Sequence, residues 1–331
     1  MRLKSSIFLW VSLATVIPLS ALVLGITAYS ERLYRHNVDE TIQGGIKNIV
    51  SELEFRFNYE REVMLSLASL PVMKQFRETL SQVANGTTPG TYTNELAALN
   101  NLLTGFQHSV PGVDAVSVLD QSGNPLVKVY LGKQEVASQV TSSSEKIDTS
   151  ILSRMRELKP HTLLYGELFV SQDGENIKPL LNPIVTLENG KGEVVGFLAA
   201  ESFGDQLDHL LQVLPRSHQF KIEIVELNAA NESRHGLILY SDIQNILFNQ
   251  QHVNTPKLWQ QIDQGIWQEV EQNRNGSFYL KDQSHIYFYK EFYPYNNLEV
   301  SWVVMLRIDE GELTAPFNRI RIGLLVFAVR A

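Results

Sequence analysis

The segment Ile7–Tyr29 contains no charged residue, and it constrains this chain more than any other feature of the sequence. A helix needs roughly 20 apolar residues to cross the hydrocarbon core of a bilayer, and this segment is long enough. Arg2 and Lys4 precede it, so the positive-inside tendency puts residues 1–6 in the cytoplasm and the long remainder on the other side. We therefore predict a transmembrane helix over residues 7–29 and an extracytoplasmic body.

A cleavable signal peptide is the alternative interpretation of the same segment. Its apolar region is usually about 7–15 residues long and ends at a small-x-small cleavage site. Thr27 and Ala28 match such a site poorly, and Pro18 is tolerated in a membrane helix because the freed carbonyl can find another donor locally. The sequence therefore favours an anchor that is retained.

Composition and motifs exclude several classes of protein. The chain has 331 residues and no cysteine, which rules out disulfides, thiolate metal sites and a lipidated N-terminal cysteine. Its net charge of -8 is opposite to the basic face that nucleic acid requires. The sequence has no histidine pair at helical i, i+4 spacing and no HExxH, GxSxG, P-loop or GxGxxG motif. We expect no catalytic residue, no metal, no cofactor and no nucleic-acid partner.

Apolar residues recur every three or four positions after the anchor and predict a long amphipathic helix that leaves the membrane. They are Val38, Ile42, Ile46, Ile49, Leu53, Phe57, Met64 and Leu67. Pro71 interrupts this helix before a further helical segment, so residues 30–83 are predicted to form a stalk. An ordinary surface helix is the alternative. Because the stripe is longer than a small domain needs for packing, we predict that it mediates a homodimer.

The rest of the chain alternates strand, turn and helix patterns in an order that occurs twice. A helix at Asn94–His108 comes before the first set, which comprises strands Val113–Leu119 and Pro125–Leu131, a helix at Asp148–Leu158, and strands Thr162–Ser171, Ile177–Leu187 and Glu193–Ser202. A short helix at Asp205–Leu214 comes before the second set, which comprises strands Gln219–Leu227 and Gly236–Asp242, a helix at Pro256–Gln272, and strands Ser277–Lys281, Ile286–Tyr295 and Glu299–Ile308. The repeated ββαβββ order predicts an α+β fold of two modules with antiparallel sheets. The membrane-distal module covers residues 84–205 and the membrane-proximal module covers residues 206–311.

A final helix begins near Asp309 and runs into the apolar segment Ile322–Val329. So short an apolar run cannot span a bilayer. We interpret residues 312–331 as the start of a second, truncated transmembrane helix, with a short interfacial tail as the alternative.

This architecture resembles the double Cache (dCache) family of bacterial receptor sensor domains. The most specific stretch is Tyr165–Leu207, whose tyrosine-led strand, acidic turn, proline-containing strand and glycine-turn strand are similar to those of the family. Ser122–Lys133 is similar to a family segment in which a basic residue, here Lys128, follows a glycine turn. The Arg-x-Trp-Tyr signature of the amino-acid-binding branch is missing, which argues against an amino-acid ligand.

The resemblance implies a PAS-like sheet in each module, ligand binding chiefly in the distal module, and a homodimer in the bacterial inner membrane. It also implies a cytoplasmic output domain, such as a histidine kinase or a diguanylate cyclase. Our leading hypothesis is therefore the periplasmic ligand-sensing region of a two-component or related signal-transduction receptor. A membrane-tethered binding or scaffolding protein without an output domain is the alternative, and an extracytoplasmic hydrolase is third because no nucleophile or acid is identifiable.

Strand alternation selects the candidate ligand-binding residues. It puts Lys128 and Tyr130 on one face of their strand and aims Glu201 from one face of another. A small ligand that carries a carboxylate and an amine would satisfy both charges in a pocket. An internal salt bridge or a solvated pair is the alternative. Tyr165 and Glu167 are weaker candidates on a neighbouring strand.

Overall fold

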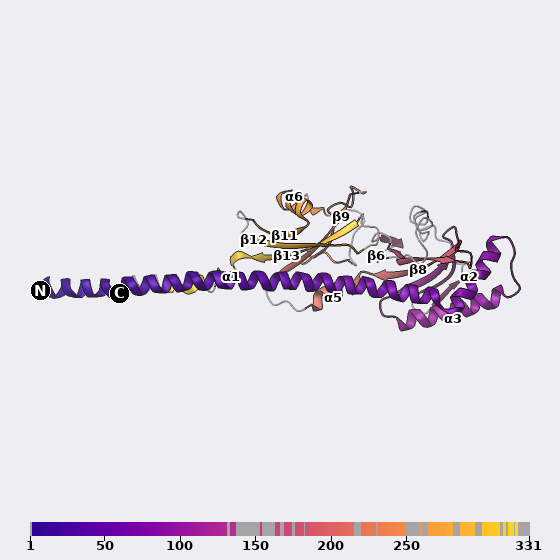
Figure 1. The fold of residues 1–331 in the computed structure, drawn as a ribbon, viewed down its shortest axis with the longest axis horizontal. Helices are drawn as coiled ribbons and strands as arrows, with labels where there is room; N and C mark the ends of the chain where they lie inside the picture. The colour runs from indigo at the N-terminus through magenta and orange to yellow at the C-terminus, as the bar shows by residue number, and fades with distance from the viewer. Residues whose placement is uncertain are drawn as a thin grey trace.

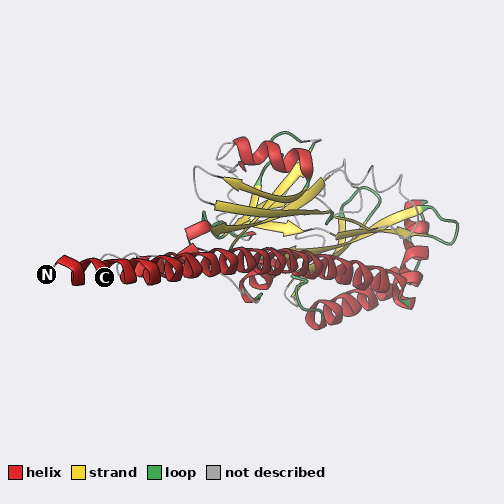
Figure 2. Cartoon of the chain, turned by 60° about the vertical axis from the view of Figure 1, so that its left-hand side comes forward, coloured by secondary structure: helices red, strands yellow, loops and turns green. Residues whose placement is uncertain are grey.

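One long helix organises the molecule. In the computed structural model, α1 (Arg2–Ser69) runs along its length with Pro18 inside it, and two β-sheets lie one after the other along this helix (Figures 1 and 2). The structure describes residues 2–130, 133–136, 153, 163–165, 169–173, 176–181, 183–214, 220–229, 231–248, 258–259, 264–280, 285–294, 300–311, 314–315, 317–320 and 322–323.

The apolar stripe of α1 packs against these sheets. Ile42 is 1% exposed and Ile49 is 3% exposed within the single chain. The ring of Phe57 lies edge-on to that of Trp302, with centroids 5.5 Å apart. The prediction that this stripe mediates a homodimer is therefore wrong, because the aliphatic faces of the chain's own sheets already remove these side chains from water.

Two shorter helices complete the layer beside the first sheet. Pro71 starts α2 (Pro71–Ala84), where a proline costs no helical hydrogen bond. The next helix, α3 (Tyr92–Ser109), buries Leu99 and Leu103, and the ring of Tyr92 stacks on Phe76 of α2 at 6.3 Å. With the far end of α1 they cover one face of the sheet.

The first sheet contains eight strands. They are β1 (Ala115–Leu119), β2 (Pro125–Tyr130), β3 (Lys133–Val136), β4 (Leu163–Tyr165), β5 (Phe169–Asp173), β6 (Asn176–Leu181), β7 (Pro183–Glu188) and β8 (Val194–Phe203). Their order is β3-β2-β1-β8-β6-β5, with β7 also beside β8 and β4 beside β7, and every pairing is antiparallel. The hairpin predicted between Val113 and Leu131 is confirmed as β1 and β2.

Two predicted strands are each divided in the structure. The predicted strand Ile177–Leu187 appears as β6 and β7, which both pair with β8 in one continuous register. The predicted strand Thr162–Ser171 appears as β4 and β5. The register of the pair Tyr165↔Pro183 differs by one residue from that of the pair Phe169↔Leu180, so the two pairings do not belong to one continuous ladder. Of the predicted helix Asp148–Leu158, only Ser153 lies within the described residues.

The second sheet repeats this topology. Its elements are β9 (Lys221–Asn228), β10 (Ile238–Ser241), α6 (Gln264–Asn273), β11 (Asn275–Leu280), β12 (His285–Phe292) and β13 (Val300–Asp309). The strand order β10-β9-β13-β12-β11 matches the order β2-β1-β8-β7-β4 of the first sheet. A short helix, α5 (Asp205–Val213), connects the two halves as predicted. The duplication inferred from element order is therefore present in the strand connections.

The second sheet has two buried faces. One packs on α1 and belongs to the main core, with Ile222, Ile224 and Trp302 among its side chains. The other is covered by α6, which lies on the far side of the sheet from α1 (Figure 1) and forms a second core that includes Trp267 and Met305.

The beginning and the end of the chain lie at the same end of the molecule (Figure 1). Arg35 of α1 pairs with Glu310 at 3.0 Å, and the ring of Tyr34 meets that of Phe317 at 5.5 Å. Among the residues that the structure describes, no helix meets the length and apolarity needed to span a membrane. The spans predicted over residues 7–29 and 312–331 thus remain predictions.

Candidate functional site

The two faces of the first sheet differ in chemistry. The face under α1, α2 and α3 is aliphatic, with Val116, Val118 and Leu198 fully buried. Residues paired directly across an antiparallel ladder share a face, so Ser117 and its partner Lys128 lie together on the other side. This second face carries a buried apolar cluster, made of Leu119, Leu164, Ile184, Phe197 and Ala199. Small and polar side chains lie beside that cluster, and because of them we call this side of the sheet the polar face.

Lys128 and Glu201 meet on the polar face. Their strands, β2 and β8, flank β1 on its two sides. The β1 residues between them are Ala115 and Ser117, whose small side chains let the two longer ones reach across. Lys128 Nζ lies 3.1 Å from Glu201 Oε1, with only 7% of the lysine side chain and 23% of the glutamate side chain exposed. The structure thus joins the two leading candidates as a partly buried salt bridge.

Of the other three predicted site residues, the structure describes two. Tyr130 is half-buried at the end of β2 and follows Lys128 by two residues, which puts it on the same face. Tyr165 lies in β4 with Pro183 as its ladder partner. Glu167 lies outside the described residues. Ligand binding by these five residues stays a prediction.

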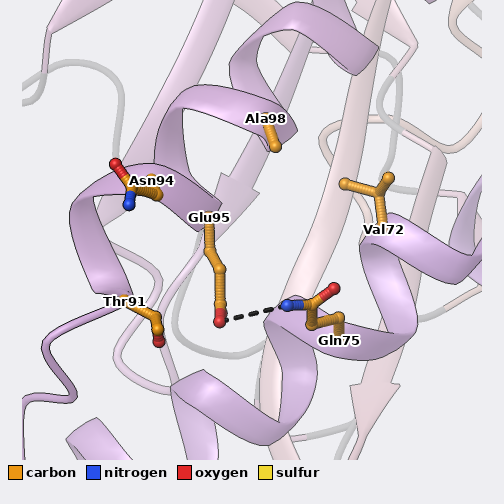
Figure 3. Close-up of a pocket in the computed structure, with 6 residues that line it drawn as sticks. All are labelled: Val72, Gln75, Thr91, Asn94, Glu95 and Ala98. Carbon is orange, nitrogen blue, oxygen red and sulfur yellow. Dashed lines mark hydrogen bonds between the residues drawn. The ribbon is translucent and has the colours of Figure 1, made fainter.

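A surface cavity of about 240 Å³ lies between α2 and α3 (Figure 3). Its polar centre is Glu95, which accepts hydrogen bonds from Thr79 and, at 3.2 Å, from Gln75. The hydrogen bond from the Thr79 hydroxyl is the main cause that lowers the pKa of Glu95. Because these donors already serve the carboxylate, the arrangement resembles a contact that joins two helices.

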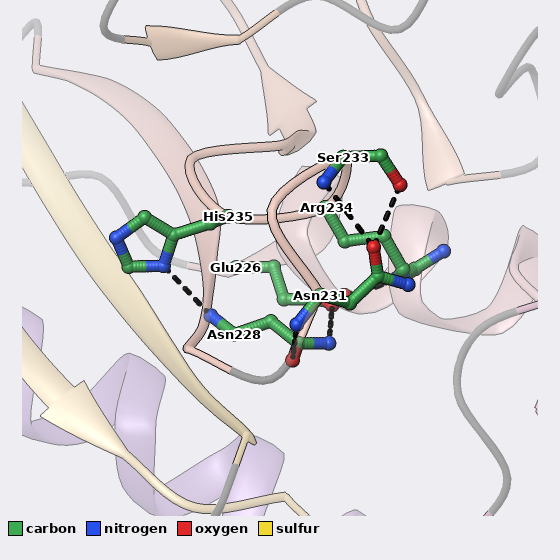
Figure 4. A network of polar contacts seen from close by, with 6 residues as sticks. All are labelled: Glu226, Asn228, Asn231, Ser233, Arg234 and His235. Atoms are coloured by element: carbon green, nitrogen blue, oxygen red, sulfur yellow. Dashed lines mark hydrogen bonds and ion pairs between the residues drawn. The ribbon is translucent and has the colours of Figure 1, made fainter.

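A buried ion pair anchors the loop between β9 and β10 (Figure 4). Glu226 is fully buried, and Arg234 donates to its two oxygens at 2.8 and 2.5 Å. Asn228 donates to the same carboxylate at 3.0 Å. His235 Nδ1 accepts the Asn228 backbone N–H at 3.1 Å, which leaves Nε2 to donate to Glu271 at 3.0 Å. With all these groups satisfied inside the chain, the network has a structural role.

Glu223 is a second buried carboxylate, on the α6 face of the second sheet. It is 2% exposed, and Ser241 donates to its Oε1 at 2.7 Å. Burial raises the pKa of Glu223 to about 7, although the hydrogen bond from Ser241 and the charge of Arg307 act in the opposite direction.

Glu223, Glu226 and Arg234 were not among the residues predicted from the sequence. Both carboxylates lie between aliphatic residues in the interior of β9, which is the signal that could have drawn attention to them. The arginine that neutralises Glu226 comes from the polar loop beyond the strand. No group of three or more potential metal ligands gathers in the described part of the chain.

Comparisons of sequence and of structure give different results. No protein-family model and no curated protein sequence matches the chain. Solved structures do match. One is a domain of a sensory box/GGDEF family protein from Vibrio parahaemolyticus, at 12% identity and a TM-score of 0.58, covering 82% of this chain and 95% of that one. Another is the extracellular domain of the histidine kinase vpHK1S-Z8, at 12% identity and a TM-score of 0.61, covering 88% and 99%.

The chain has the fold of a bacterial sensory domain. A third match, the periplasmic sensory domain of the Campylobacter jejuni chemoreceptor Tlp1, covers 82% of this chain and 94% of that one, at 10% identity and a TM-score of 0.50. These matches to sensory domains of kinase, GGDEF and chemoreceptor proteins confirm, for the fold, the resemblance to double Cache domains. At such identities a sensory fold can carry different ligands, so the ligand must be argued from the residues.

Proposed function

We propose that this chain is the periplasmic ligand-sensing region of a bacterial inner-membrane receptor and that its first module binds a small molecule. The observation that carries the proposal is the Lys128–Glu201 pair on the polar face, the side of the sheet away from α1, α2 and α3. The module in question is the predicted distal module, residues 84–205.

Lys128 and Glu201 are each suited to exchange the other for a charged group of a ligand. A buried salt bridge contributes little net stability, because the desolvation of both charges offsets their attraction. A ligand that carries a carboxylate and an amine gives Lys128 an anion and Glu201 a cation in return. Opening the pair would then cost little once the ligand is bound, whereas a ligand with one charge would replace the partner of only one of the two residues.

Anchoring in the membrane is part of the proposal. Large apolar side chains are exposed along the first turns of α1. They are Trp10, Ile17, Leu22, Leu24, Ile26 and Tyr29. Lipid would cover such side chains at a much lower cost than water. The same helix then contacts both modules, and Arg35 and Tyr34 join it to the end of the chain, so a ligand that favours one arrangement of the modules would bias both membrane-proximal ends.

The ligand-site test begins with a thermal-shift screen of small organic acids, amines and amino acids on the full chain in detergent. For a ligand that raises the melting temperature, we expect Lys128→Ala and Glu201→Ala each to weaken binding about tenfold or more, because each removes one charged partner. Lys191→Ala, in an exposed turn of the same module, is the matched control and should leave affinity unchanged. Unchanged affinity in both site variants would place the ligand elsewhere.

We also propose a homodimer, formed by the face of α1 that points away from the sheets. This face exposes Leu33, Phe55 and Tyr59 at 48%, 68% and 40%, and the last two are one helical turn apart. Exposed aromatic side chains on one stripe are typical of a surface that a partner covers.

Single cysteines test this surface cleanly because the chain has none of its own. Under mild oxidation in membranes, Phe55→Cys should form a disulfide between two chains, since the two α1 helices would meet there. Ile49→Cys, on the buried stripe of the same helix, is the control and should remain monomeric. The opposite pattern, or no crosslink at Phe55 and Tyr59 alike, would refute the interface.

A further inference from the structure

On the α6 face of the second sheet, three buried polar atoms have no hydrogen-bond partner among the described residues. They are Glu223 Oε2, Arg307 Nε and Trp259 Nε1. Glu223 and Trp259 are each 2% exposed. A buried polar group without a hydrogen-bond partner destabilises the folded state, so folded proteins rarely keep several of them together without something to bind them.

These atoms belong to one face of one sheet. Glu223 pairs with Met305 across the β9–β13 ladder, and Arg307 follows Met305 by two residues, so all three share a face. The ring of Trp259 lies edge-on to that of Tyr287 at 6.0 Å, and Tyr287 is the ladder partner of Arg307 on β12. Trp259, Tyr287 and Met305 also share the core that α6 covers.

The local hydrogen bonds explain why Glu223 Oε2 stays unused. The Ser241 hydroxyl accepts the N–H groups of Ile243 and Gln244, at 3.2 and 3.0 Å, so its single proton goes to Glu223 Oε1. Ser241 therefore has nothing left to offer the second oxygen. The nearby Asp242 carboxylate is an acceptor and cannot serve it, since its oxygens receive the Tyr240 hydroxyl and the Ile222 N–H.

The three atoms require different groups from a ligand. When Glu223 is ionised, its Oε2 needs a donor, whereas Arg307 Nε and Trp259 Nε1 need an acceptor, which a carboxylate supplies well. Glu223 and Arg307 occupy diagonal positions on adjacent strands, roughly 7–8 Å apart at their α-carbons. A molecule that reaches both must carry its donor and its carboxylate close together.

We propose that the second module holds a small-molecule site on the α6 face of its sheet, and that this site takes a small α-hydroxy or α-amino acid. The ligand's hydroxyl or ammonium donates to Glu223 Oε2, and its carboxylate accepts from Arg307 and Trp259. This site is separate from the Lys128–Glu201 pair, so the receptor would bind two different ligands, or the same ligand at two sites.

Isothermal titration of the full chain in detergent with glycine and, separately, with glycolate tests the proposal. These are the smallest molecules of the two kinds, so their size does not prevent entry, and they distinguish an ammonium from a hydroxyl donor. The titrations are made in a Lys128→Ala background, which removes the proposed site of the first module. We expect at least one of the two compounds to bind.

Two variants locate that binding. In the same background, Trp259→Phe keeps the ring but removes its N–H, and Glu223→Gln keeps an acceptor for Ser241 but loses the carboxylate. Each should weaken binding about tenfold or more. Glu232→Gln, in the exposed β9–β10 loop, is the control and should not change affinity. If neither compound binds, or if Trp259→Phe and Glu223→Gln both bind as tightly as the background, the proposal is wrong and ordered water satisfies these atoms.

Discussion

Arg234→Ala should lower the free energy of unfolding by about 3–5 kcal/mol, as expected when one partner of a buried ion pair is removed. The arginine supplies two hydrogen bonds to Glu226, which is fully buried. Without it, the Asn228 amide is the remaining side-chain donor to this carboxylate among the residues that the structure describes, and the charge stays in an apolar core without its cation. Urea unfolding followed by tryptophan fluorescence measures the loss, since Trp259, Trp267 and Trp302 all lie in the second module.

Two further variants test whether the loss of stability comes from breaking the buried ion pair. Arg61→Ala removes an arginine from an exposed pair, with Glu62 at 3.0 Å, and should cost less than about 1 kcal/mol. Adding Glu226→Gln to Arg234→Ala should recover part of the stability, because the orphaned charge is then gone. A loss for Arg234→Ala as small as that for Arg61→Ala would show that Glu226 is solvated.

Glu223 should make the second module less stable as the pH rises from about 4.5 to 7. Its folded-state pKa of about 7 lies above the ordinary value of 4.5, so folding favours the protonated acid. The stabilisation is complete below pH 4.5 and is lost once the pH exceeds 7. The shift corresponds to about 3 kcal/mol over this range.

Glu223→Gln removes this dependence because the amide does not titrate. Relative to the wild-type chain, the variant should gain up to about 3 kcal/mol between pH 4.5 and pH 8, as measured by urea unfolding at the two values. Comparing the chains at each pH cancels the contribution of every other group, and Glu232→Gln provides the same change at an exposed position. An equal difference at both pH values would mean that Glu223 titrates normally in the folded state.

Local patterns were sufficient to predict most elements of this fold. The spacing of Val38, Ile42 and Ile49 predicts a helix because side chains three and four apart share a helical face. Period-two alternation predicts strands because successive side chains point to opposite faces of a sheet, and Gly and Asn residues predict the turns between the strands. The repeated ββαβββ order predicts two copies of one module. The five strands of the second sheet have the same order as their counterparts in the first sheet.

The partners of those elements depended on tertiary structure. The sequence shows that Ile42 and Ile49 share a stripe, but a stripe is equally suited to a second chain or to a sheet, and only the folded chain shows that its own sheets cover it. Alternation placed Lys128 and Glu201 on faces of their strands. That they meet at 3.1 Å depends on β1 lying between β2 and β8 with small side chains at the crossing.

The surroundings of the buried carboxylates also depended on tertiary structure. Glu223 and Glu226 stand out in the sequence only as acids between aliphatic residues of one strand, and their environments come from distant segments. Arg234 satisfies Glu226 from the following loop, whereas Glu223 receives Ser241 from the next strand and leaves one oxygen unpaired. Most helices and strands of this chain depend on neighbours within a few residues, so local sequence patterns predict them. A pKa, a salt bridge or an unsatisfied atom depends on which remote side chains share a low-dielectric interior, and only the tertiary structure decides that.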